Sequence, residues 1–307
     1  MEEIYKLSHE EHEEILKEIM KNVFKGAKPQ EKPKIFIMGG QPGAGKSTFI
    51  NQLINSEEGK DCLIINADEY RAYHPKIKEI YTKHPEEMAT ITDLDVRDWT
   101  QRIFALAIQN RNNIIFEGTM RTPQICETIK DLHSKGYEVN VHVMAVNFYE
   151  SKLSTYSRYE EALLNGEMPR HTPPEAHDET YGKMLKTLQQ IEDDGCYNKI
   201  TIHGRDKDVN LTPKEGENRV GSVMAILKHR EKVWSRTKLQ QYENWADNVI
   251  SSMQNRGETR YISQVEELKT NAKQMTIVPA QKELSSLLLS LQQSKLLHQK
   301  RDPATSK

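Results

Sequence analysis

Short apolar runs alternate with stretches of helical spacing through the first two thirds of the chain. The apolar runs have the length of buried strands, and the stretches between them space their apolar residues three or four apart, as in Asp93–Asn110. Strands separated by helices predict a doubly wound parallel α/β sheet with right-handed crossovers. The five expected strands are Lys34–Met38, Cys62–Asn66, Asn113–Phe116, Glu138–Asn147 and Lys199–His203.

The two ends of the chain differ from this central pattern. Ser8-x-x-Glu11 is a capping box, and the apolar residues at helical spacing up to Gly26 predict an N-terminal helix. Beyond Gly216 the spacing is helical, and only Arg301–Lys307 has the composition of a disordered segment. We therefore expect one α/β domain over residues 1–216, including the N-terminal helix, and a helical C-terminal extension over residues 217–307.

A glycine-rich turn follows the first expected strand and opens a helix. The pattern Gly40-x-x-x-x-Gly45-Lys46-Ser47 fits a phosphate-binding P-loop, in which glycines let backbone N–H groups approach a triphosphate closely. Lys46 is expected to reach the β- and γ-phosphates, and the Ser47 hydroxyl to ligate Mg²⁺. The helix N-terminus directs partial positive charge at the same phosphates. ATP and Mg²⁺ are thus the expected cofactors, bound by Gly40, Gln41, Pro42, Gly43, Ala44, Gly45, Lys46, Ser47 and Thr48.

Carboxylates stand where two other strands end. Asp68 follows the second strand and Glu117 ends the third, and ligands of an open parallel sheet bind beyond the carboxyl ends of its strands. A small-molecule kinase needs a carboxylate that accepts a hydroxyl proton, and cations over the transferring phosphoryl group. Asp68 supplies the first, while Arg158 and Arg170 supply the second and are expected to act on the transition state.

Each of these residues also has an alternative role. Asp is favoured as a helix N-cap, which is the alternative for Asp68. Glu117 suits Mg²⁺ as well as a substrate, and Arg158 and Arg170 suit surface ion pairs.

The neighbouring residues distinguish the classes of P-loop protein. A GTPase needs Asn-Lys-x-Asp after a late strand, but Thr201 stands where that Asp is required. A mechanical ATPase usually ends a strand in a Mg²⁺-binding Asp with a Glu beside it, whereas here a strand ends in Glu117-Gly118-Thr119. These residues favour a kinase. The alternatives are a nucleotide-dependent switch whose basic helical tail docks a partner, and a kinase of another nucleotide or sugar acceptor.

Composition narrows the choice further. The 307 residues have a formal net charge of −2, which argues against a nucleic-acid partner, because affinity for phosphate backbones needs a basic surface. The acidic balance of residues 1–227 argues in the same way against a polynucleotide 5′-kinase. No run of about 18 apolar residues occurs and the N-terminus is polar, so we expect a cytoplasmic protein with no membrane partner. Cys62, Cys126 and Cys196 lack metal-ligand spacing and are interpreted as small buried apolar residues.

Charge is unevenly distributed along the chain. Residues 228–307 hold 14 Lys and Arg against 8 Asp and Glu, whereas residues 1–227 hold 29 against 37. Every candidate catalytic residue precedes Arg205. We therefore expect residues 217–307 to modulate the kinase or to contact an inhibitor, and a chain ending near Gly216 to keep phosphate transfer.

Several motifs, taken together and in order, resemble the zeta toxin family. The resemblance runs from about residue 8 to about residue 206, and only its P-loop part is generic. The motifs are Gly39–Ser47, Ile65–Asp68, His74-Pro75, Glu117-Gly118-Thr119-x-Arg121, Met144–Val146, Ser157–Glu160 and Ala176–Asp178.

The resemblance implies a P-loop kinase that phosphorylates UDP-N-acetylglucosamine on the sugar 3′-hydroxyl and so blocks cell-wall precursor synthesis. It also implies a small helical antitoxin as partner. Lys46 would bind the phosphates, Asp68 would be the base, and two arginines, Arg158 and Arg170, would clamp the transferred phosphoryl group. The implied acceptor-binding residues are Asp68, Glu117, Thr119, Arg121 and Gln101, the last standing where a family member offers a substrate-contacting Glu.

Overall fold

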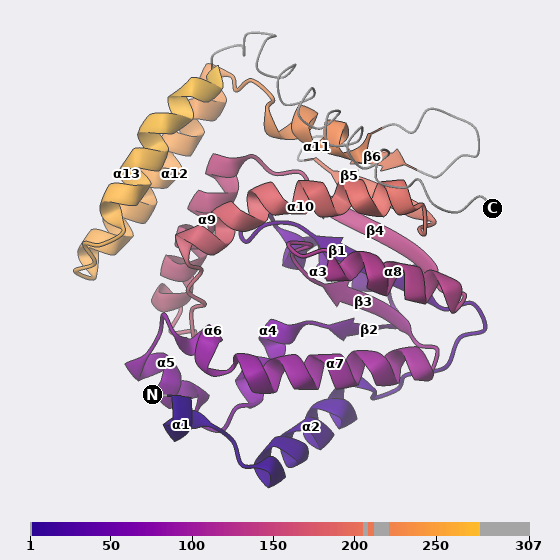
Figure 1. Cartoon of the computed structure of the whole chain (residues 1–307). Helices are drawn as coiled ribbons and strands as arrows, with labels where there is room; N and C mark the ends of the chain where they lie inside the picture. Colours follow the sequence, from indigo (N-terminus) through magenta and orange to yellow (C-terminus); the bar gives the residue numbers. More distant parts are fainter. Residues whose placement is uncertain (1, 205–207, 212–220, 277–307) are drawn as a thin grey trace, which may run out of the picture.

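A single twisted sheet forms the centre of the molecule in the computed structural model, which describes residues 2–204, 208–211 and 221–276 (Figure 1). The strand order is β2-β3-β1-β4-β5-β6. The first five strands run parallel, as predicted, and β6 lies antiparallel to β5 at the edge. Their bounds are β1 Lys34–Gly39, β2 Cys62–Ile65, β3 Asn113–Glu117, β4 Glu138–Met144, β5 Lys199–His203 and β6 Asp208–Leu211.

The apolar runs form central strands because both faces of the sheet are covered. In β1, Ile35 and Ile37 belong to the cluster on one face, while Phe36 and Met38 belong to the cluster on the other. A parallel strand buried on both sides needs an almost continuous apolar sequence, and this is the pattern from which the five strands were predicted.

Helices fill the layers on either side of this sheet. The capping box is present, since the Ser8 hydroxyl accepts the Glu11 amide at 3.2 Å, and the predicted helix over Asp93–Asn110 is found over Asp93–Gln109. The helices are α1 Glu2–Tyr5, α2 His9–Val23, α3 Lys46–Ile54, α4 Ala67–Tyr70, α5 Ile77–Lys83, α6 Met88–Ile91, α7 Asp93–Gln109, α8 Gln124–Ser134, α9 Phe148–Leu164, α10 Pro174–Asp194, α11 Ser222–Arg230, α12 Arg236–Asn255 and α13 Ile262–Asn271.

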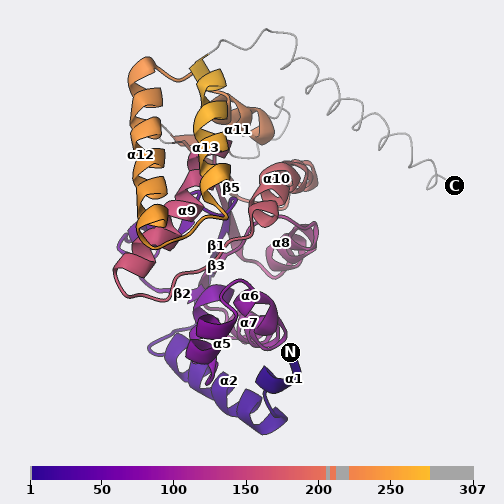
Figure 2. The same ribbon diagram turned by 90° about the vertical axis from the view of Figure 1, so that its left-hand side faces the viewer.

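The C-terminal extension packs at two places. Helix α11 lies against α10 and β5, with Ile226 fully buried in the main core cluster. Helices α12 and α13 lie side by side along α9 (Figures 1 and 2), where they share a second cluster with Leu153 and Tyr156. The predicted boundary between residues 216 and 217, and the segment Arg301–Lys307, lie outside the described residues.

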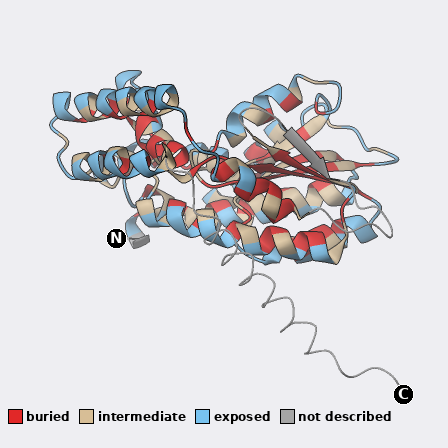
Figure 3. Ribbon diagram, turned by 90° about the horizontal axis from the view of Figure 1, so that it is seen from above, coloured by how far each residue is buried: buried red, intermediate tan, exposed pale blue. Residues whose placement is uncertain are grey.

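Burial follows this layered arrangement. The central strands are buried, whereas the outer surfaces of the helices are exposed (Figure 3). Cys126 is buried, while Cys62 and Cys196 are only partly so. In the described part of the chain, no helix combines the length and the apolar character needed to cross a bilayer.

Candidate active site

The P-loop joins β1 to α3 in a conformation that requires glycine. Gly43 and Gly45 have φ angles of 73° and 86°, in the left-handed region that disfavours other residues. A Cβ on Gly43 would also lie 2.0 Å from the Ser151 carbonyl oxygen at the start of α9. The loop therefore packs directly on α9, and it can follow this path only because Gly43 has no side chain.

Lys46 lies across this loop. Its ammonium group donates to the carbonyl oxygens of Gly40 at 2.9 Å and Gln41 at 3.3 Å. Burial lowers the pKa of Lys46 to about 8, although the negative charges of Glu117 and Asp68 act in the opposite direction. Ser47, next along α3, is exposed in the first helical turn and accessible to a ligand.

Asp68 follows β2 at the same edge of the sheet and is not the cap of α4. The cap is Asn66, whose side-chain oxygen accepts the Asp68 amide at 3.1 Å. The Asp68 carboxylate therefore remains available for other partners. It forms an ion pair with Arg170, and its other oxygen accepts from Arg71 Nε at 3.3 Å.

Glu117 ends the neighbouring strand β3. Its carboxylate accepts from the Asn66 side-chain amide at 3.0 Å, so one residue both caps α4 and holds Glu117. Burial raises the pKa of Glu117, and the negative charge of Asp68 raises it further, while Lys46 opposes the shift. Glu117 thus lies within the electrostatic reach of both the P-loop lysine and the expected base.

Arg158 and Arg170 approach the same place from α9 and the loop that follows it. Arg158 Nη2 donates to the Thr172 hydroxyl at 3.2 Å, which ties the helix to that loop. Partial desolvation lowers the pKa of Arg158, as does the positive charge of Arg170 nearby, while Asp68 acts in the opposite direction. The two predicted cations are therefore near each other and near Asp68.

The other predicted acceptor residues are placed differently. The Thr119 hydroxyl accepts the Arg121 amide at 3.4 Å, but the Arg121 guanidinium reaches Glu179 on α10 at 3.1 Å. Gln101 is exposed on α7, and among the described residues it shares no hydrogen bond with Asp68 or Glu117. The structure thus brings Lys46, Asp68, Glu117, Arg158 and Arg170 together, and the roles of Thr119, Arg121 and Gln101 stay predictions.

Two further arginines at the site were not found from the sequence. Arg71 contacts Asp68 and also donates to the buried Thr92 hydroxyl at 2.5 Å, joining the expected base to the segment before α7. Its position three residues after Asp68 in a helical segment was the available signal. Arg230 donates to the Gln41 side chain of the P-loop at 3.0 Å from 189 residues away, and no local pattern indicates that contact.

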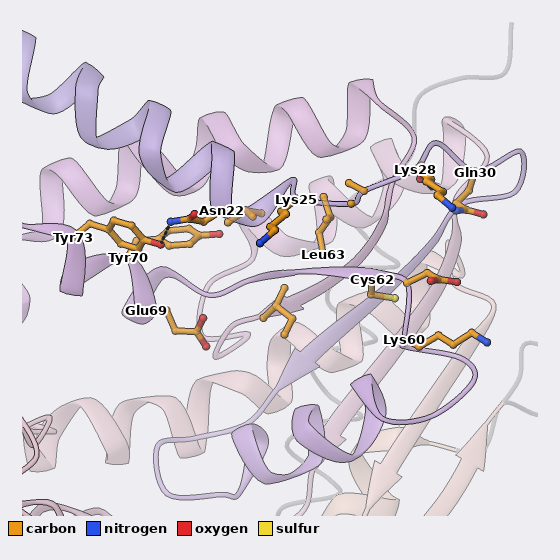
Figure 4. A pocket seen from close by; sticks show the side chains of 15 residues that line it. Asn22, Lys25, Lys28, Gln30, Lys60, Cys62, Leu63, Glu69, Tyr70 and Tyr73 are labelled. Carbon is orange, nitrogen blue, oxygen red and sulfur yellow. Dashed lines mark hydrogen bonds between the residues drawn. The ribbon is translucent and has the colours of Figure 1, made fainter.

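A cavity of about 540 Å³ lies beside β2 and α4 (Figure 4). It is lined by Glu69 and Tyr70 of α4, by Tyr73, by residues of β2 and by the segment around Lys25. None of the P-loop residues lines this cavity. The candidate active site is therefore the charge cluster at the carboxyl ends of β1, β2 and β3, and not this cavity.

The fold, the P-loop and the charge cluster define a protein of the P-loop kinase class. The family model described as Zeta toxin matches residues 18–217, well over half of the chain, so the chain belongs to the zeta toxin family.

Individual relatives agree with this membership. Toxin PezT of Streptococcus pneumoniae is 28% identical over 238 residues, which cover 77% of this chain and 93% of that protein. Toxin zeta of Streptococcus pyogenes is 27% identical over 225 residues, covering 70% of this chain and 78% of that toxin. Together with the family match, these relatives support a toxin with kinase-like function.

Solved structures share the fold. One describes the PezAT chromosomal toxin–antitoxin system of Streptococcus pneumoniae and matches with a TM-score of 0.67 at 23% identity, covering 81% of this chain and 99% of that chain. Another, AvrRxo1-ORF1:-ORF2 with ATP, matches with a TM-score of 0.54 at 11% identity, covering 85% of this chain and 88% of that one.

Proposed function

We propose that this protein transfers the γ-phosphate of ATP to the 3′-hydroxyl of UDP-N-acetylglucosamine and so blocks cell-wall precursor synthesis. The observation that carries the proposal is the ion pair between Asp68 and Arg170 beside Glu117, within the electrostatic reach of Lys46. A proton acceptor, a phosphoryl-binding cation and a P-loop lysine in one cluster are the parts that phosphoryl transfer to a hydroxyl requires.

The conformation of the P-loop supports the proposal that it binds a triphosphate with its metal ion. Because Gly43 has no side chain, the loop packs closely on α9 and keeps a tight curve. Such a curve would let its backbone N–H groups bind phosphate. Ser47 would hold Mg²⁺ through its hydroxyl, since this residue is exposed in the first turn of α3. When bound, Mg²⁺ neutralises charge on the phosphates. Lys46 would bind the phosphates from the position that the Gly40 and Gln41 carbonyls give it.

The remaining residues act on the acceptor and the transferred group. Asp68 would orient the acceptor hydroxyl and accept its proton late in the transfer. Arg158 and Arg170 would stabilise the charge on the phosphoryl oxygens, where guanidinium groups contribute on the order of 10³-fold in rate. We assign contacts with the sugar nucleotide to Glu117, Thr119, Arg121 and Gln101.

A small helical antitoxin is the proposed protein partner. One solved structure that shares this fold belongs to a toxin–antitoxin system, PezAT, and two relatives of this chain are themselves named toxins. A kinase that depletes a precursor of the cell wall has to be held inactive in the cell that makes it, which motivates such a partner for this chain.

The test is incubation of the protein with ATP, Mg²⁺ and a panel of nucleotide sugars, read by mass for one added phosphate. We expect the added mass on UDP-N-acetylglucosamine, with NMR placing the phosphate on the 3′-oxygen. Transfer only to a different sugar nucleotide would contradict the proposed acceptor and still support the kinase activity. ATP hydrolysis at an equal rate with and without every acceptor, and no transfer, would instead support a nucleotide-dependent switch.

A further inference from the structure

The loop that carries Arg170 is positioned mainly by side chains. It runs from Asn165 to Pro173 between α9 and α10, and in the described part of the chain its turn-type backbone hydrogen bonds involve residues 165–167 and 173. Residues 170–172 each reach a different partner. Arg170 pairs with Asp68, His171 contacts Tyr261, and Thr172 accepts from Arg158.

Tyr261 lies in the turn between α12 and α13, residues 256–261, which we call the tip of this helix pair. Its hydroxyl lies 3.1 Å from His171 Nε2 and 3.2 Å from a Glu86 carboxylate oxygen. Because a carboxylate only accepts, the tyrosine donates to Glu86 and accepts from His171 Nε2–H. His171 Nδ1 is buried without a hydrogen-bond partner, and burial lowers the pKa of His171, both of which fit the neutral ring that this arrangement needs.

The tip is fixed to the rest of the molecule from two directions. Arg260 forms an ion pair with Glu86 at 2.6 Å, so the tip contacts the turn between α5 and α6. Arg256 donates to both oxygens of Glu160 at 2.7 to 3.1 Å, and Glu160 is a buried residue of α9 two positions beyond Arg158. The tip is thus held on the helix that carries one catalytic arginine and contacts the loop that carries the other.

We propose that Tyr261 is a positioning residue for Arg170, acting through His171. The inference rests on the proposed function, because it concerns the arginine assigned there to the transferred phosphoryl group. Tyr261 lies outside residues 18–217, which the family model matches. The C-terminal extension is therefore part of the machinery that places the catalytic groups, beyond any role in contacting an inhibitor.

The kinetic test compares Tyr261→Phe with the parent protein. The substitution keeps the ring and removes the hydroxyl that bridges His171 and Glu86. We expect kcat to fall about 5- to 10-fold, the factor of one lost hydrogen bond, with KM for ATP changed less than about twofold. In an Arg170→Ala background the same substitution should have no further effect, because the residue that it positions is gone. Equal losses in both backgrounds would overturn the proposal.

The matched control is Lys269→Gln. Lys269 is on α13 and pairs with Asp247 of α12 at 2.6 Å, so the variant loses a contact of the same helix pair that does not involve the loop of Arg170. We expect its kcat to equal that of the parent. A fall like that of Tyr261→Phe would show that the variants only loosen the helix pair as a whole, and would contradict the inference.

A second measurement does not depend on the acceptor. Limited digestion with trypsin, read by mass spectrometry, should cleave after Arg170 faster in Tyr261→Phe than in the parent protein, and at the parent rate in Lys269→Gln. Unchanged cleavage in Tyr261→Phe would overturn the inference even if the protein transfers phosphate. Faster cleavage in a protein that phosphorylates no acceptor would instead leave the positioning of Arg170 supported and overturn the proposed function.

Discussion

Asn66 caps α4 and so leaves the Asp68 carboxylate available for catalysis. Asn and Asp are both favoured as helix N-caps, so the sequence around Ile65 could not decide which residue caps α4. The structure gives that role to Asn66, which follows β2 with an extended backbone and whose side-chain oxygen accepts the Asp68 amide. Asp68 then lies inside the first helical turn with its carboxylate directed to Arg170 and Arg71.

Asp68→Asn should separate chemistry from stability. The variant keeps the Asn66 cap and loses the proton acceptor, so we expect transfer to fall on the order of 10²-fold or more, as is typical of a positioned base. ATP affinity and Tm should stay near those of the parent protein, and toxicity in a growth assay should be lost. Asn66→Ala is the matched comparison, since it removes the cap and should cost about 1 kcal/mol of stability. Normal transfer by Asp68→Asn would move the role of base to Glu117.

Lys46 predicts a pH dependence of ATP binding. Its pKa of about 8 lies below the ordinary value of 10.5, because burial disfavours the ammonium form. As pH rises through about 8, the free protein loses the charge that attracts phosphate, so ATP affinity should fall by up to about tenfold per pH unit. Binding at pH 8.5 should also take up a proton, because bound phosphate favours the charged lysine.

Isothermal titration calorimetry checks this expectation for Lys46. The enthalpy of binding MgATP at pH 8.5 should vary with the ionisation enthalpy of the buffer, and the variation should be much smaller at pH 7, where Lys46 is already protonated in the free protein. An enthalpy at pH 8.5 that does not vary with the buffer would mean that the ammonium stays fully charged across this range and that its surroundings do not lower its pKa.

At the scale of elements, local patterns in the sequence predicted the five parallel strands and the residues at their ends. Five strands were found because their two buried faces impose continuous apolar runs, and the residues at strand ends, such as Asp68 and Glu117, followed from the topology of a parallel sheet. Strand β6 was missed, because four residues that pair only with the edge of β5 leave no comparable pattern. Arg71 stands only three residues after Asp68, but its contact with Thr92, 21 residues further along the chain, leaves no local pattern.

The contact between the P-loop and α9 gives a prediction at this scale. Gly43→Ala would combine a left-handed backbone with a Cβ at 2.0 Å from the Ser151 carbonyl, so either the loop or the start of α9 must move. We expect ATP binding to be lost and Tm to fall clearly. Gly26→Ala is the control, because Gly26 has a similar φ of 78° but nothing within 4 Å of the added Cβ. That variant should lose only about 1–2 kcal/mol of stability and keep ATP binding, as thermal unfolding with and without ATP would show.

At the scale of the whole molecule, the extension contacts the site twice, and no local pattern in the sequence could indicate either contact. Charge reversal along the chain indicated a separate role for residues 217–307 but not which residues they touch. Arg230 contacts Gln41 across 189 residues of sequence, and Tyr261 contacts His171. Because Ile226 and Arg230 of α11 are buried against the α/β domain, we now expect a chain ending near Gly216 to lose stability as well as transfer.

Arg230 is unusual because it is a buried cation whose described hydrogen-bond acceptors carry no charge. It donates to the Tyr181 carbonyl at 2.9 Å and to the Gln41 side chain at 3.0 Å, and its guanidinium lies 3.7 Å from the centre of the Tyr181 ring. Burial lowers its pKa. Removing a charge from the interior relieves a desolvation cost of several kcal/mol, while each acceptor left without a donor costs about 1–3 kcal/mol. These two effects act in opposite directions on the free energy of unfolding.

Arg230→Met should therefore affect ATP binding more than stability. We expect Tm to stay within a few degrees of the parent value, because the two effects on the free energy of unfolding offset each other. ATP affinity should fall about 5- to 10-fold, since Gln41 loses the donor that fixes its side-chain oxygen beside the P-loop. Lys228→Met is the matched control, because Lys228 is an exposed residue of the same helix and its loss changes the net charge equally. A large fall in Tm with unchanged ATP affinity would show that Arg230 only holds α11 in the core, and that the extension does not act on the P-loop.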